Sequence, residues 1–156
     1  MQHVFWLIEG EVAGRCSPAS EAWTPAALMS AGIQCIYSLT PLSDGIKAGL
    51  SGLQQFNCLL PAVTTPGLLS EPVTAQLTQQ LTNIVADIQQ CREQNMPVLL
   101  HCATGNEWTA LVMACYLVSI GAAPVHAVSQ VRAVHELAFN RDGWDQFVFD
   151  VIYAMQ

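Results

Sequence analysis

Short runs of apolar residues, rich in β-branched and aromatic side chains, mark the strands that the sequence predicts. Turn-forming residues flank these runs, at Gly10, Pro41, Asp44-Gly45, Pro61 and Pro97. Apolar runs of this length that are bounded by turn residues are typical of buried strands. The predicted strands are Val4–Ile8, Cys35–Leu39, Phe56–Leu60 and Val98–His101.

Apolar residues spaced three or four apart predict helices between and after these strands. The longest, Thr74–Gln90, has one apolar face and one uncharged polar face, with Ser70 as its expected N-cap and Pro72 suited to its first turn. The segment Thr109–Val118 is apolar all round, which predicts a buried central helix. The remaining predicted helices are Thr24–Ser30, Pro124–Leu137 and Trp144–Ala154.

The order of these elements predicts the fold class. Strands that alternate with helices favour an α/β fold with a largely parallel sheet. We therefore expect a twisted, mostly parallel central sheet of about four to five strands, flanked by helices. The chain has 156 residues and no linker or internal repeat, so residues 1–156 are predicted to form a single domain.

Composition and charge exclude several classes of function. Only 11% of residues are charged and 52% are hydrophobic, which excludes intrinsic disorder. The net charge is −7 and the sequence has no cluster of Lys and Arg, so neither a nucleic acid nor an anionic membrane surface is an expected partner. No apolar run reaches the roughly 20 residues of a membrane-spanning helix.

The ends and the cysteines of the sequence predict a cytoplasmic location. The N-terminus lacks the basic segment of a signal peptide and soon meets Glu9 and Glu11. The 6 cysteines are scattered, mostly within apolar stretches, and none forms a Cys-x-x-Cys pair. This pattern favours free thiols over disulfides, and no spacing of Cys and His indicates a metal site. No cofactor is predicted.

The segment 97–110 carries the candidate chemistry. A hydrophobic strand ends at His101-Cys102, a short loop containing Gly105 follows, and the buried helix then begins. This arrangement directs backbone N–H groups and a helix N-terminus toward one point, which favours an anion. A cysteine at that point is favoured as the thiolate, the form that attacks a phosphate monoester.

The same segment resembles the phosphate-binding loop of the cysteine-dependent protein tyrosine phosphatases, whose pattern is His-Cys, five residues, Arg and then Ser or Thr. His101, Cys102, Gly105 and Thr109 are in register with it. Segments 14–18, 32–40 and 128–132 resemble the compact dual-specificity members, so the resemblance implies a dual-specificity-phosphatase-like fold. It also implies that Cys102 is the nucleophile, that Thr109 assists the thiolate and that His101 orders the loop. The phosphate-binding positions that it implies are Ala103, Thr104, Gly105, Asn106, Glu107 and Trp108.

Two departures from the family pattern predict weak or absent catalysis. Trp108 stands where the family has the arginine that binds the phosphate through two hydrogen bonds. The family's general acid is an Asp on a loop before the long helix, yet no carboxylate lies between Asn57 and Ser70, and Asp44 is in a different loop. Loss of both groups predicts a rate deficit on the order of 10⁴ or more. The resemblance therefore implies a pseudophosphatase with a binding or regulatory role, whose partner is a phosphorylated protein or a small phosphate ester.

Several alternatives remain open at this stage. The chain could be an active tyrosine or dual-specificity phosphatase that works through a phosphocysteine on Cys102, with Arg15, Arg132 or Arg141 replacing the missing arginine. It could also be a structural domain with a closed pocket. Trp108 has three readings: a core residue, a plug over a disused pocket, or an altered residue, because the Arg codon CGG and the Trp codon TGG differ by a single base. The sequence makes no prediction of the oligomeric state.

Overall fold

The computed structural model describes residues 4–18, 22–61 and 71–156 of the chain. Its centre is a 5-stranded sheet with the strand order β1-β2-β5-β3-β4. Strand β1 pairs with β2 in the antiparallel direction, and every other pairing is parallel. The strands are β1 (Phe5–Ile8), β2 (Val12–Cys16), β3 (Cys35–Ser38), β4 (Gln54–Asn57) and β5 (Val98–Cys102).

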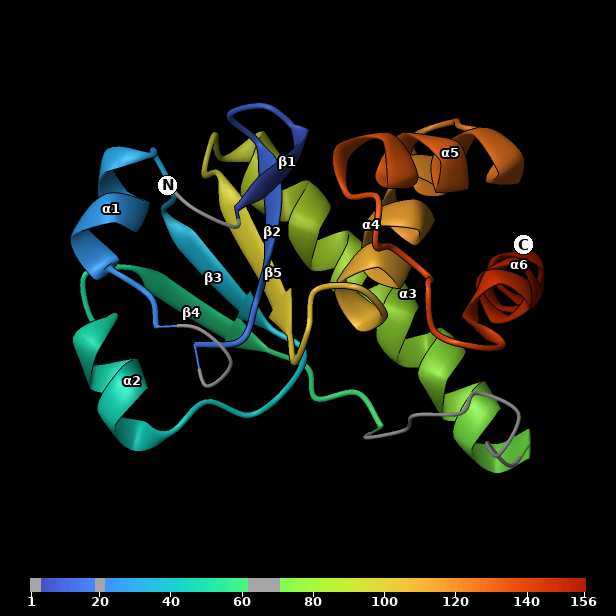
Figure 1. Cartoon of the computed structure of the whole chain (residues 1–156), viewed down its shortest axis with the longest axis horizontal. Coiled ribbons are helices and arrows are strands. Elements are labelled where there is room, and N and C mark those ends of the chain that lie inside the picture. Colours follow the sequence, from blue (N-terminus) through green and yellow to red (C-terminus); the bar gives the residue numbers. More distant parts are fainter. Residues whose placement is uncertain (1–3, 19–21, 62–70) are drawn as a thin grey trace.

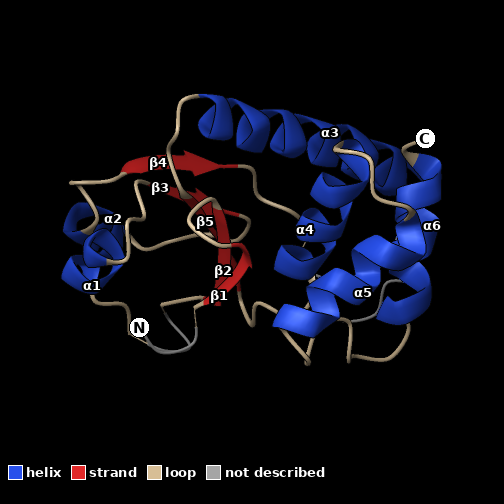
Figure 2. Cartoon of the chain, turned by 90° about the horizontal axis from the view of Figure 1, so that it is seen from above, coloured by secondary structure: helices blue, strands red, loops and turns tan. Residues whose placement is uncertain are grey.

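Helices cover both faces of this sheet (Figures 1 and 2). Helices α1 (Pro25–Ser30) and α2 (Asp44–Gly49) lie on one face, over a small core that includes Leu28 and Leu99. The larger core lies on the other face, around the buried helix α4. The helices on that side are α3 (Glu71–Glu93), α4 (Trp108–Ser119), α5 (Pro124–Val134) and α6 (Trp144–Ala154). The predicted α/β class and mostly parallel sheet are confirmed.

The structure corrects several predicted elements. Strand β2 was not predicted, because Gly14 and Arg15 interrupt its apolar pattern. Gly14 is required there, since a Cβ at this position would lie 2.6 Å from the Phe5 ring and 2.7 Å from the Met113 side chain. Strand β4 is Gln54–Asn57 and not Phe56–Leu60, because as an edge strand it exposes polar residues instead of forming an apolar run.

The remaining corrections concern helices. Asp44 and Gly45 begin α2 rather than forming a turn, with Ser43 as the N-cap whose hydroxyl accepts a hydrogen bond from the Ile46 N–H. Helix α5 ends at Val134 instead of Leu137, since His135 has an extended backbone conformation. Helix α3 is longer than predicted at both ends, and its predicted cap, Ser70, lies outside the described residues. Within the described residues, no helix is both long and apolar enough to cross a bilayer.

Candidate functional site

The candidate site lies at the carboxyl end of β5, the central strand of the sheet. All residues of β5 are buried, and the loop 103–107 joins the strand to the N-terminus of α4. The Cys102 side chain lies beneath this loop and is only 2% exposed. Its Sγ accepts hydrogen bonds from the backbone N–H of Gly105, at 3.2 Å, and of Thr109, at 3.4 Å. Two N–H dipoles and the start of a helix therefore converge on one sulfur atom, the arrangement of a backbone anion site.

Gly105 is required for the tight path of the loop. Its φ is +83°, a backbone conformation that favours glycine. A Cβ at this position would also lie 3.3 Å from the backbone of Arg15 and Cys16 at the end of β2. The loop is held against β2 by a further hydrogen bond, from the Ser17 N–H to the Ala103 carbonyl at 3.2 Å. Backbone packing against β2 thus fixes the curve of the loop around Cys102.

His101 lies on the opposite face of the sheet from Cys102, as neighbouring residues of a strand must. Its Nε2 shares a hydrogen bond of 2.7 Å with the Ser38 hydroxyl on β3, and its ring meets the Trp23 indole edge-on, with centroids 5.0 Å apart. Burial lowers the pKa of His101 to about 4, so the imidazole is neutral at physiological pH. The side chain is fully buried and links β5 to β3 just before the loop. Its role in ordering the loop stays a prediction. A role as a general base has no geometric support, because the side chain faces away from Cys102.

The outer side of the loop is cross-linked by polar side chains. The Thr104 hydroxyl donates a hydrogen bond to Oε2 of Glu107, and it accepts one from the Asn106 N–H at 3.0 Å. The other carboxylate oxygen of Glu107, Oε1, lies 3.0 Å from Nε of Arg141. Both oxygens of this carboxylate are therefore engaged, one by the loop itself and one by the segment between α5 and α6.

The segment between α5 and α6 also binds the loop through Asn106. The Asn106 carbonyl accepts a hydrogen bond of 2.9 Å from the Phe139 N–H, and its side-chain Oδ1 shares one with Nε2 of His135. The His135 ring stacks on Phe5, with centroids 4.1 Å apart. Beside these contacts is a cavity of about 290 Å³, lined by Val4, Phe5, Cys16, Thr104, Asn106, His135 and Leu137. The loop is thus fixed from two sides.

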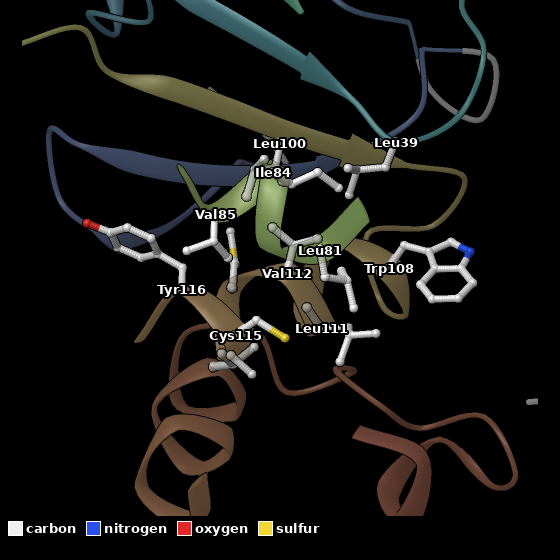
Figure 3. Packing of buried hydrophobic residues seen from close by; sticks show 14 of the residues in the cluster. Leu39, Leu81, Ile84, Val85, Leu100, Trp108, Leu111, Val112, Cys115 and Tyr116 are labelled. Atoms are coloured by element: carbon white, nitrogen blue, oxygen red, sulfur yellow. The ribbon is translucent and has the colours of Figure 1, made fainter. Parts of the chain in front are cut away.

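Trp108, the first residue of α4, directs its side chain into the aromatic core rather than over the loop. Its indole meets Trp144 edge-on, with centroids 4.9 Å apart, and Phe147 at 6.2 Å. Its single N–H, on Nε1, donates to the Pro61 carbonyl at 3.0 Å. The side chain is only 5% exposed and lies at the margin of the core around α4 (Figure 3). Its one donor is therefore already occupied, and only the backbone N–H of residue 108 is left to face an anion.

Thr109 donates its backbone N–H to the Cys102 sulfur, whereas its hydroxyl makes no such hydrogen bond. The Oγ1 atom is buried and has no hydrogen-bond partner among the described residues. A buried hydroxyl without a partner costs free energy, which any polar group that reaches it would offset. This geometry is compatible with the assisting role that the resemblance implies. Among the residues that the structure describes, no group of Cys, His, Asp and Glu is arranged to hold a metal ion.

A family model described as "Tc-R-P: Polymorphic toxin system, DSP-PTPase phosphatase" matches residues 14–122. The chain belongs to this DSP-PTPase family. The matched region begins within β2 and includes the whole Cys102 loop and α4, so the predicted dual-specificity phosphatase fold is confirmed. No curated protein matches the chain significantly.

Solved structures of DSP-PTPase proteins share the fold. Tk-PTP in its active form is 19% identical with a TM-score of 0.72, covering 99% of this chain and 96% of its own. Human DUSP28 is 17% identical with a TM-score of 0.72, covering 100% and 97%. A kinase associated phosphatase with serine in place of its catalytic-site cysteine is 14% identical with a TM-score of 0.74, covering 98% and 95%. At these identities the similarity shows the fold alone.

Sequence reasoning located the loop of this DSP-PTPase chain but missed the residues that support it. Glu107, one of the phosphate-binding positions that the resemblance implies, pairs with Arg141 in the structure. His135 is hydrogen-bonded to Asn106, a support of the loop that the sequence did not indicate. The only signal in the sequence was Glu107 itself, a carboxylate in a buried loop that requires a cation or donor. Asp44, the candidate acid, is the first residue of α2, on the far face of the sheet from α4 (Figure 1).

Proposed function

We propose that this chain binds a phosphate-bearing ligand at the Cys102 loop and hydrolyses it at or near the background rate. Its role is then binding or regulation in the cytoplasm, and its partner is a phosphorylated protein or a small phosphate ester. The observation that carries the proposal is the position of the Trp108 side chain, which packs on Trp144 and donates to Pro61. Position 108 therefore supplies no guanidinium and no side-chain donor to the phosphate.

The loop nevertheless supports anion binding. It lies at a helix N-terminus, and the Gly105 and Thr109 N–H groups already point toward the sulfur of Cys102. Backbone donors of this kind are a general anion-binding device. The contacts with β2 and with the segment after α5 hold the loop in this geometry, so little ordering is required when an anion binds.

The chain lacks two catalytic groups, the arginine at residue 108 and the general acid, and each has a known effect on rate. A preorganised donor to transition-state charge typically contributes about 10²–10³ in rate, and a general acid about 10²–10⁴. Glu107, the carboxylate within the loop, is a poor replacement for the acid, because Thr104 and Arg141 already engage both of its oxygens. The sequence has no carboxylate between Asn57 and Ser70, a segment that lies largely outside the described residues.

A second candidate function is slow phosphoryl transfer by Cys102 through a phosphocysteine. The hydrogen bonds that Gly105 and Thr109 donate to Sγ favour this alternative, since a nucleophilic cysteine acts from such a position among backbone donors. A good leaving group would need no general acid, so activated aryl esters are the substrates on which any residual activity would be seen.

Steady-state hydrolysis of p-nitrophenyl phosphate tests the proposal. We expect wild type to be indistinguishable from Cys102→Ser, because the loop binds the ester without stabilising its transition state. Cys16→Ser is the matched control, since Cys16 is the register partner of Cys102 on the neighbouring strand β2. Turnover of about 1 s⁻¹ or more that is lost in Cys102→Ser and retained in Cys16→Ser would establish the active alternative instead.

A further inference from the structure

A phosphate dianion bound at the Cys102 loop requires a cation nearby, and the sequence offers few. The chain contains only 5 residues of Lys and Arg against 12 of Asp and Glu. All five cationic residues lie within the described segments. Backbone N–H groups alone provide partial charges, and a charged donor strengthens each hydrogen bond to phosphate about twofold. The position of each cationic side chain therefore decides which of them can serve the loop.

Four of the five have other environments. Arg92 binds Glu11, with N–O at 2.6 Å, and also the Tyr116 hydroxyl. Lys47 is on α2, on the far side of the sheet from α4 (Figure 1). Arg132 on α5 lies over the Phe139 ring at 5.6 Å. Arg15 remains as the buried alternative.

Arg15 is close to the loop in its backbone but not in its side chain. It pairs in register with His101, so both side chains point to the face of the sheet opposite Cys102. Its guanidinium lies 5.9 Å from the Trp23 ring centroid and donates to the Ala22 carbonyl at 3.2 Å. This arginine stabilises the Trp23 side of the sheet and does not face the bound anion.

Arg141 differs from all of these, because it contacts a side chain of the loop. Its Nε lies 3.0 Å from Oε1 of Glu107, and the other oxygen of that carboxylate is held by the Thr104 hydroxyl. The Glu107 side chain is only 11% exposed whereas the Arg141 side chain is 44% exposed, so the buried carboxylate orients an accessible guanidinium. Guanidinium has five N–H donors, and the salt bridge uses the one on Nε. Among the described residues, the Nη donors have no further partner.

We propose that Arg141 is the anion-binding cation of the Cys102 loop, positioned by Glu107 in place of an arginine at residue 108. This inference rests on the proposed function. The ligand class is a phosphate monoester, inorganic phosphate or a tetrahedral analogue such as tungstate. Because Arg141 comes from the segment between α5 and α6, it approaches the loop from outside. It therefore adds affinity for the anion without taking the position beside the Cys102 sulfur from which an arginine at residue 108 would act on the transition state.

Isothermal titration with sodium tungstate and with inorganic phosphate tests this role. We expect Arg141→Gln to weaken binding of both ions about tenfold, as removal of a charge-assisted hydrogen bond does. Arg141→Lys keeps the charge but loses the fork of donors, so an intermediate affinity is expected. Arg132→Gln is the matched control, because it removes one positive charge from an exposed arginine on the same side of the molecule and should change the affinity less than twofold.

The outcomes separate this inference from the proposed function. Equal affinities for wild type and Arg141→Gln would overturn the role of Arg141 while leaving anion binding intact. Equal losses in Arg141→Gln and Arg132→Gln would reduce the effect to net charge and would also overturn it. Failure of wild type to bind either ion would overturn the proposed function, and the inference with it. Thermal unfolding of each variant confirms that the compared proteins are folded at the temperature of the titration.

Discussion

Replacement of Trp108 with phenylalanine should destabilise the protein by about 2–3 kcal/mol. Phenylalanine keeps a ring against Trp144 and Phe147, so most of the aromatic packing remains. The variant loses the hydrogen bond from Nε1 to the Pro61 carbonyl, with a net contribution of about 0.5–1.5 kcal/mol, and the apolar contacts of the larger indole. For a chain of this size, a loss of 2–3 kcal/mol lowers the Tm by about 5–10 °C.

Trp144→Phe provides the matched control for this substitution. Trp144 is also buried, but its indole N–H has no hydrogen-bond partner among the described residues. The same ring atoms are removed without loss of a hydrogen bond, so Trp144→Phe should cost about 0.5–1.5 kcal/mol less than Trp108→Phe. Urea unfolding followed by far-UV circular dichroism measures both, at equal m-values. An equal or larger loss in Trp144→Phe would refute the assignment of Trp108 as a hydrogen-bonded core residue.

Other predictions concern the pH response and the loop. Burial lowers the pKa of His101 to about 4, from 6.5 in the unfolded chain, so the free energy of unfolding should fall by about 3 kcal/mol as the pH decreases from 6.5 to about 4. In His101→Gln, the urea midpoint should depend less on pH over this range. Gly105→Ala should cost about 1–3 kcal/mol in urea unfolding, whereas Gly45→Ala in α2, where a Cβ meets nothing within 4 Å, should cost none. Trp108→Arg should lose about 3–5 kcal/mol of stability, and any gain in aryl-phosphate turnover should be greatest for good leaving groups.

The parts of the fold that could be predicted are those with a strong local pattern. The boundaries of α6 were predicted as observed, because its apolar residues recur at helical spacing. Those of β5 and α4 were predicted within two residues, because continuous apolar runs define them. The edge strand β4 and the short helix α2 lack such a pattern, since they are largely exposed. Strand β2 is buried, but Gly14 fits under the Phe5 ring, a contact between strands that is invisible in a one-dimensional pattern.

In the candidate site too, the locally encoded part could be predicted and the contacts with distant residues could not. The loop around Cys102 could be located from the sequence, because the strand, the glycine and the helix are consecutive. Its supports could not be assigned. Arg141 was one of three arginines considered as a replacement for the missing one, and its contact with Glu107, like that of His135 with Asn106, forms only in the folded chain. The direction of the Trp108 side chain was open for the same reason: it depends on Trp144, Phe147 and Pro61, which are distant in sequence.

The proposal that this loop binds phosphate without performing chemistry is tested most directly at the sulfur of Cys102. The measurement is the intact mass of the protein, with assignment of any modified residue, after acid quenching of a reaction with excess p-nitrophenyl phosphate. This ester needs no general acid, so the result reports on transition-state stabilisation at the loop alone. We predict an unmodified Cys102 at all reaction times. A phosphoryl adduct on Cys102 that is absent from Cys102→Ser would contradict the account, because it would show that the loop supports phosphoryl transfer with tryptophan at residue 108.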